Sequence, residues 1–283
     1  MHTLHFTAET SEDGVTQRDF VLTGVPAGPG TPGESGTSGT PGGSGTSGIP
    51  GVLWSPAPAT GRPAPLVLIG HGGGAHKKHP AMLGRARLLV TGCGYHVAVI
   101  DAPGHGDRPR SAQDQESVAA LRRAQAAGAP EAPVVVPYNA RLAVQAVPEW
   151  QATLDALQEL PEIGPGGPVG YVGIGLGTAI GMPLVAAEPR IAAAVFSPHW
   201  PDALIEHARR ITVPVEFGMQ WDNERISRAG SLALFDAFAS KEKSLHVNAG
   251  RHLELPRFEI DSSVRFLARH LGGPVGAAAA VTA

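Results

Sequence analysis

The stretch YVGIGLGTAIG, residues 171–181, has the pattern of a tight strand-to-helix turn that presents a catalytic side chain. In that pattern, G-x-S-x-G, a serine stands between two glycines and attacks the substrate. Here the central residue is Gly175, which has no side chain and cannot form a covalent intermediate. Neither Leu176 nor Thr178 is a plausible substitute, since Thr178 is expected a turn into the following helix. Position 175 is therefore a vacant nucleophile position, and any chemistry must come from other groups.

Two other sets of residues could still act on a carbonyl compound. The run GHGGGAHKKHP (70–80) directly follows the apolar stretch LVLI, and its three consecutive glycines can turn tightly and direct backbone N–H groups at a ligand oxygen. Later in the chain, Asp222 follows one apolar run and His252 follows the next, an order that brings a carboxylate and an imidazole together. A base and an oxyanion site suit any reaction that builds negative charge on a carbonyl oxygen.

The elements that must position these groups begin at Pro65, where short apolar runs alternate with helical patterns. Runs of this near-continuous apolar character are typical of parallel strands buried on both faces of a sheet. The expected strands are 66–70, 96–101, 169–175, 191–196, 213–219 and 244–250, and the expected helices are 80–91, 149–160, 177–187, 202–210, 229–239 and 257–271. Strands near 3–8, 18–23 and 51–54 are expected to form an antiparallel N-terminal edge. The predicted fold class is α/β, with one doubly wound, mainly parallel sheet.

Two segments interrupt this pattern. Residues 27–48 are all Gly, Pro, Ser or Thr except Ala27 and Glu34, which predicts a disordered insertion in a β-hairpin. Residues 109–147 contain a polar helix candidate and are expected near the crevice at the strands' carboxyl ends, either as a small helical lid or as a packing insert. We expect one domain over residues 1–271 and a flexible tail at 272–283.

Several of these motifs together resemble the α/β-hydrolase superfamily, in its dienelactone-hydrolase-like or acyl-esterase branch. The matching features are the HGGG run, the D-x-P-G-H-G loop at 101–106, the turn at Gly175, and the late acid and histidine. The resemblance covers about residues 50–271 and implies the α/β-hydrolase fold. With glycine at the nucleophile position, the resemblance implies an atypical member of the superfamily.

The resemblance also implies roles for individual residues. His252 is the expected general base and Asp222 the expected acid that orients it, with Glu224 in reserve should Asp222 point away. The expected oxyanion hole consists of the backbone amides of Gly72 or Gly73 and Leu176.

Other side chains are expected to line a substrate pocket because they flank these motifs. They are His71, His105, Ser197, Trp200 and Trp221. The histidine spacing H-x4-H-x2-H on the glycine-rich loop is no recognised zinc pattern, so we predict no metal. Thr178 replaces the last glycine of a dinucleotide-binding G-x-G-x-x-G, and we predict no cofactor.

The composition excludes some classes of function. The net charge of −3 provides no broad basic field for nucleic acid. No apolar run is long enough to span a membrane, the first residues lack a signal-peptide pattern, and the only cysteine, Cys93, leaves no partner for an internal disulfide. These observations predict a cytoplasmic protein that binds neither nucleic acid nor membrane. The oligomeric state stays open.

Three functions remain compatible with these residues. The favoured one is nucleophile-free proton transfer on a small-molecule or peptide carbonyl substrate, as in an epimerase, isomerase, cyclase or lyase, because it needs only a base and an oxyanion site. The first alternative is hydrolysis of an ester, thioester or lactone by a water that His252 activates. The second is an inactive pseudo-hydrolase that binds a ligand or partner.

Overall fold

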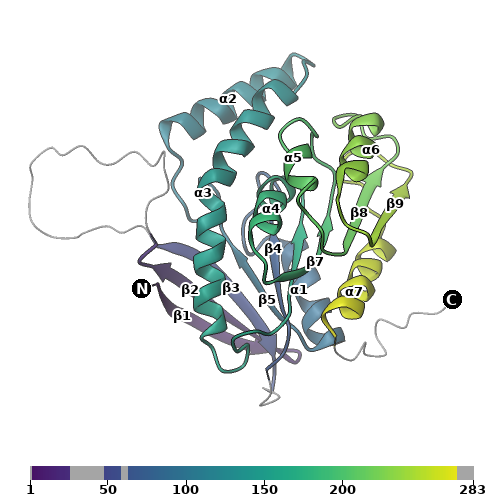
Figure 1. The fold of residues 1–283 in the computed structure, drawn as a ribbon. Helices are drawn as coiled ribbons and strands as arrows, with labels where there is room; N and C mark the ends of the chain where they lie inside the picture. The colour runs from purple at the N-terminus through teal and green to yellow at the C-terminus, as the bar shows by residue number, and fades with distance from the viewer. Residues whose placement is uncertain (1, 26–47, 59–62, 273–283) are drawn as a thin grey trace, which may run out of the picture.

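A computed structural model describes residues 2–25, 48–58 and 63–272 of the 283-residue chain. The strands in these ranges form a nine-stranded sheet in the order β1-β2-β3-β5-β4-β6-β7-β8-β9. Figure 1 shows helices covering this sheet on both sides. The predicted α/β class and the doubly wound, mainly parallel arrangement are confirmed.

The parallel part of the sheet is built from the apolar runs. Successive strands from β5 through β4 to β9 pair in parallel. Every residue of β4, β5 and β6 is buried, as expected for strands covered on both faces. The six strands are β4 (Leu66–Gly70), β5 (His96–Ile100), β6 (Val169–Gly173), β7 (Ile191–Phe196), β8 (Val215–Gln220) and β9 (Lys243–Asn248).

The N-terminal strands form the antiparallel edge that the sequence predicts. They are β1 (Thr3–Glu12), β2 (Val15–Thr23) and β3 (Ile49–Pro56), and β3 joins the rest of the sheet by pairing antiparallel with β5. Leu22 pairs with Ile49, so the chain on either side of the predicted insertion forms a hairpin. The insertion itself, apart from Gly48, lies outside the described residues, as does the tail beyond Gly272.

The helices bury one core on each face of the sheet. Alternate residues of β4 supply the two cores: Val67 and Ile69 pack with α1 and α7, whereas Leu66 and Leu68 face α3 and α4. The helices are α1 (Pro80–Cys93), α2 (Ala112–Ala126), α3 (Ala132–Gln158), α4 (Leu176–Ala187), α5 (Ile205–Ala208), α6 (Arg228–Ala237) and α7 (Arg257–Leu271).

The main error in the predicted elements concerns α3. We expected a helix only over 149–160, but one helix runs through Pro137 and Pro148 for 27 residues. Its buried face is continuous across both prolines, at helical spacing, and this packing offsets the backbone hydrogen bonds that the prolines cannot make. The residues of that face include Val135, Tyr138, Leu142, Ala146, Trp150, Leu154 and Leu157. The predicted helix over 202–210 is also shorter, because only Ile205–Ala208 is helical.

The segment predicted as a lid or packing insert, residues 109–147, comprises α2 and the first half of α3. A capping box between Ser111 and Asp114 starts α2. Arg141 of α3 bonds Asp114 at 2.6 Å and ties the two helices together. Figure 1 shows α2 beside the first turns of α3.

Candidate active site

The turn at Gly175 has the geometry of a nucleophile elbow. Gly175 is the N-cap of α4, with φ +54° and ψ −106°. The two flanking glycines are sterically required: a Cβ at Gly177 would lie 2.0 Å from the carbonyl oxygen of Gly70, and one at Gly173 would lie 2.8 Å from the carbonyl oxygen of Gly177. Helix α4 therefore packs directly against the ends of β4 and β6.

Gly175 itself has space around it. A Cβ built there would meet only the Cα of Gly72, at 3.8 Å, which is ordinary van der Waals contact. The glycine-rich loop after β4 thus lies next to the place where a nucleophile's side chain would stand. The vacant position is open toward that loop: apart from Ile174 and Leu176, no other atom of the described residues lies within 4 Å of that Cβ.

Ser197, directly after β7, stabilises the turn at Gly175 by hydrogen bonding. Its Oγ accepts a hydrogen bond from the backbone N–H of Gly175 at 2.8 Å and lies 3.3 Å from Oγ1 of Thr178. Thr178 is fully buried, and its hydroxyl lies 3.0 Å from the carbonyl oxygens of Gly173 and Ser197. These contacts hold strand β7 against the turn, a role that the sequence did not reveal for Ser197.

Backbone N–H groups with no protein partner gather at this turn. Within the described chain, the N–H groups of Gly72, Gly73 and Leu176 have no protein acceptor. Leu176 is the first residue of α4, where an N–H has no intrahelical partner and the helix dipole favours negative charge. An oxyanion hole needs unpaired N–H groups of this kind, and that role for these amides stays a prediction.

His71 fixes the glycine-rich loop through two hydrogen bonds, and its place in a substrate pocket stays a prediction. Its Nδ1 donates to the carbonyl oxygen of Gly72 at 2.9 Å, and its Nε2 accepts from the N–H of Ala102 at 3.0 Å. Burial lowers the pKa of His71 to about 4 and keeps the ring neutral. His105 is also buried, and its Nδ1 donates to the carbonyl oxygen of Pro103 at 2.9 Å. Both buried rings therefore stabilise loop backbone by hydrogen bonds: His71 in the glycine-rich loop and His105 in the loop after β5.

An ion cluster that the sequence analysis missed anchors the same loop. Lys77 Nζ lies 2.6 Å from Oδ2 of buried Asp101 and 2.5 Å from Oδ2 of Asp107. The other oxygen of Asp101 accepts the N–H of Lys77 at 2.8 Å. Asp101 follows β5 directly, and a carboxylate at the end of a buried strand was the available signal.

The predicted pair of Asp222 and His252 does not form a hydrogen bond in the structure. Among the described residues, the side chain that forms a hydrogen bond with Nδ1 of His252 is that of Asn223, whose Nδ2 lies 3.2 Å away. Asp222 instead holds the backbone of the loop that carries His252: its N–H donates to the Gly250 carbonyl at 3.1 Å, and its Oδ2 accepts from the Gly250 N–H at 3.4 Å. Of the three consecutive residues Asp222, Asn223 and Glu224 after β8, only the middle one, Asn223, contacts the His252 ring through its side chain.

The reserve acid, Glu224, contacts the backbone of His252 instead of its ring. Oε2 of Glu224 accepts the N–H of His252 at 2.9 Å. Burial, and then the positive charge of Arg225, lower the pKa of the half-buried His252 imidazole. The ring is therefore neutral near pH 7, as a base must be.

The two tryptophans lie apart from the elbow contacts. Trp221 is 45% exposed, and the guanidinium of Arg228 stacks 3.4 Å above its ring. Its role as a pocket wall stays a prediction. Trp200 packs edge-on against His199.

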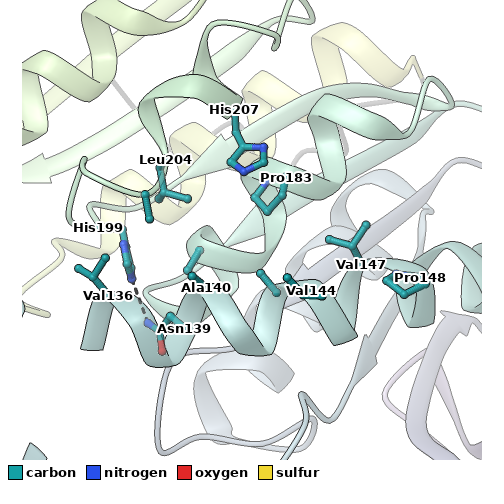
Figure 2. A pocket seen from close by; sticks show the side chains of 13 residues that line it. Val136, Asn139, Ala140, Val144, Val147, Pro148, Pro183, His199, Leu204 and His207 are labelled. Atoms are coloured by element: carbon teal, nitrogen blue, oxygen red, sulfur yellow. Dashed lines mark hydrogen bonds between the residues drawn. The ribbon is translucent and has the colours of Figure 1, made fainter. Parts of the chain in front are cut away.

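A cavity of about 350 Å³ lies between α3, α4 and the loop after β7 (Figure 2). Its walls are mostly apolar. The polar residues among them are His207 and a buried pair, Asn139 and His199, whose Nδ2 and Nε2 are 2.9 Å apart. Burial lowers the pKa of His199 to about 4. Ala179, one turn after the N-terminus of α4, also lines it. The residue that could have indicated this cavity from the sequence is His199, a polar residue in the loop that follows the apolar strand β7.

Two further surveys concern the described residues only. In this part of the chain, no group of three or more His, Cys, Asp or Glu side chains is placed to hold a metal ion. None of the helices described has the length and apolar character needed to cross a membrane.

Comparison with solved structures finds esterases. A cold-adapted esterase from an Arctic intertidal metagenomic library, in its PEG-bound complex, is 28% identical over 94% of this chain and 99% of its own, with a TM-score of 0.70. Acetyl xylan esterases from Paenibacillus sp. R4 and Thermoanaerobacterium sp. JW/SL YS485 are both 13% identical over 95% of this chain and 89% and 87% of their own, with TM-scores of 0.64 and 0.62. No protein-family model and no curated protein matches the sequence.

These neighbours correct one prediction. We favoured nucleophile-free proton transfer, and that prediction is wrong, because the similar structures are esterases and favour the hydrolytic alternative. The predicted architecture is right: with its mainly parallel nine-stranded sheet and esterase neighbours, the chain has the α/β-hydrolase fold.

Proposed function

We propose that this protein is an atypical α/β-hydrolase that cleaves an ester, thioester or lactone without a serine nucleophile. A water in the open space at Gly175 attacks the substrate's carbonyl carbon, and His252 takes the water's proton. As the resulting oxyanion collapses, the bond between the carbonyl carbon and the leaving oxygen or sulfur breaks, and His252 returns the proton to that leaving group. The backbone amides of Gly72, Gly73 and Leu176 receive the oxygen that becomes negative. Asp222 acts through the backbone of the loop that carries His252.

The observation that carries this proposal is the preserved elbow. Gly175 keeps a left-handed φ of +54°, and the space where a side chain would project faces Gly72 at 3.8 Å. A water there would have unpaired backbone N–H groups nearby, which can polarise the carbonyl that it attacks. The 28% identical esterase, which aligns over nearly the whole of both chains, supports hydrolysis as the reaction.

The proposed reaction relies on two contributions, a general base and an oxyanion hole. A positioned general base contributes about 10²–10⁴-fold, and one oxyanion-hole donor contributes about 10²–10³-fold. Covalent catalysis is absent, so we expect rates well below those of a serine esterase. The apolar cavity of about 350 Å³ beside α4 suits the hydrocarbon part of a small acyl substrate.

The test is hydrolysis of p-nitrophenyl acetate and butyrate by the purified wild-type protein and by His252→Ala. We expect turnover above the buffer rate, reduced about 10²-fold or more in the variant. The matched control is His5→Ala on the exposed outer strand β1, which should hydrolyse at the wild-type rate. Wild-type turnover no faster than buffer would reject the proposal.

A further inference from the structure

Asn223 stands where the sequence predicts an orienting carboxylate, and its amide orientation is fixed by its neighbours. Oδ1 accepts the backbone N–H of Arg225 at 3.1 Å and that of Ile226 at 3.0 Å. An amide nitrogen could not occupy that place, because it would face two donors. Nδ2 must therefore point the other way, where it lies 3.3 Å from Oε1 of Gln220 and 3.2 Å from Nδ1 of His252.

This orientation determines what the imidazole can do. The amide nitrogen has two hydrogens and no lone pair to offer, so Nδ1 of His252 must accept. In a neutral ring the single proton is then on Nε2. Among the described residues, none makes a hydrogen bond to Nε2. A carboxylate at position 223 would impose the opposite arrangement, with the proton on Nδ1 and the lone pair on Nε2.

We propose that Asn223 is a positioning residue that holds the resting His252 as its Nε2–H tautomer and so restrains it as a base. The consequence for catalysis rests on the proposed function: the ring must move its proton to Nδ1, and Asn223 must turn away, before Nε2 can take a proton from water. In serine hydrolases, replacement of the orienting carboxylate by an amide lowers kcat about 10⁴-fold for this reason. Asn223 is thus a built-in brake on hydrolysis, and Asn223→Asp should release it.

The variant fits the surroundings. One carboxylate oxygen can keep the two bonds from Arg225 and Ile226, and the other can accept Nδ1–H of His252. Gln220 can turn its amide nitrogen toward that oxygen. Asp222 and Glu224 add negative charge on either side. Arg225 is the cation nearest to position 223 in sequence, and Arg251, next to His252, lies 3.6 Å from Oε2 of Glu224.

The experiment is long-range ¹H–¹⁵N correlation NMR of ¹⁵N-histidine-labelled protein at a pH where His252 is neutral, with His252→Gln to assign its signals. In the wild type we expect an unprotonated Nδ1 and a protonated Nε2, and in Asn223→Asp the reverse. A wild-type spectrum with the proton on Nδ1 overturns the proposal, and this needs no variant to fold. The matched control is Asn139→Asp, which should change the signals of His199 and leave those of His252 as they are.

Ester hydrolysis by the same proteins separates this proposal from the function. If the tautomer reverses and kcat for p-nitrophenyl acetate rises at least 10-fold with little change in KM, the brake and the function both hold. If the tautomer reverses but neither protein hydrolyses esters, the tautomer assignment stands and the proposed function fails. If the wild type hydrolyses esters with Nδ1 already protonated, the function stands and the brake is refuted.

Discussion

Replacement of Gly175 by serine restores the missing nucleophile and tests the arrangement of the whole site. The new Cβ has room, since its nearest neighbour is the Cα of Gly72 at 3.8 Å. The backbone is the obstacle, because φ +54° and ψ −106° lie where side chains are disfavoured. Such strain costs about 1–3 kcal/mol, and for a chain of this size each kcal/mol lowers Tm by roughly 2–4 °C. We therefore expect Gly175→Ser to fold with a Tm roughly 2–12 °C lower.

The introduced serine should become acylated. Incubation with p-nitrophenyl acetate should give a burst of p-nitrophenol and a protein mass raised by one acetyl group. If Asn223 holds His252 in the wrong tautomer, the single variant reacts slowly, and the double variant Gly175→Ser with Asn223→Asp reacts faster, by up to about 10⁴-fold. The serine control is Gly84→Ser on the exposed side of α1, where a Cβ meets no atom within 4 Å and no acylation is expected.

The result that would refute this reasoning is a folded protein that never acylates. If the single and double variants both melt within the expected range yet show neither burst nor adduct, the elbow does not face a working base and oxyanion site. The proposed water position at Gly175 would then fail as well.

Three further predictions concern the framework of the site. Gly177→Ala should destabilise the fold by several kcal/mol, about 3 or more, because its Cβ would lie 2.0 Å from the Gly70 carbonyl oxygen; a Tm within 2 °C of wild type would contradict the tight contact of α4 with β4. Ser197→Ala leaves the Gly175 N–H without its acceptor and should cost about 1–3 kcal/mol in urea unfolding, whereas Ser117→Ala on exposed α2 serves as the control; equal losses would remove Ser197 as a support of the elbow. Stability should also fall with acidification, because burial lowers the pKa of both His71 and His199 to about 4, so between that value and about 6.5 the unfolded chain binds protons that the folded chain does not. Each ring should cost about 2 kcal/mol at pH 5 relative to pH 7, and urea unfolding of wild type and His71→Gln should show a smaller pH dependence in the variant; identical dependences would contradict a neutral His71.

Most of the fold could be predicted from the sequence because the central buried strands β4 and β5 are mainly apolar runs. Strands such as LVLIG and HVAVI are short, apolar and bounded by turn residues, so their positions follow from composition alone. Helix α3 could not be predicted in full, because Pro148 signals a helix start and only tertiary packing of the face that contains Leu142 and Trp150 outweighs that signal.

The candidate site also has parts that could be predicted from the sequence and one part that could not. The elbow at Gly175 and the loop at Gly72 follow from glycine patterns, which report backbone geometry directly. The partner of His252 does not, because Asp222, Asn223 and Glu224 are consecutive polar residues after one strand. Which of them reaches the ring depends on a turn in which Asn223 also accepts backbone N–H groups, and no periodicity encodes that choice.

The central claim is hydrolysis by a water at the vacant nucleophile position, and the most direct measurement is mass spectrometry of wild-type turnover in ¹⁸O-labelled water. The account predicts many turnovers of p-nitrophenyl acetate, one solvent oxygen in each acetate, and an intact protein mass that never gains an acetyl group. An acetyl adduct that forms and decays at the rate of turnover, on Ser197 or any other residue, would contradict it.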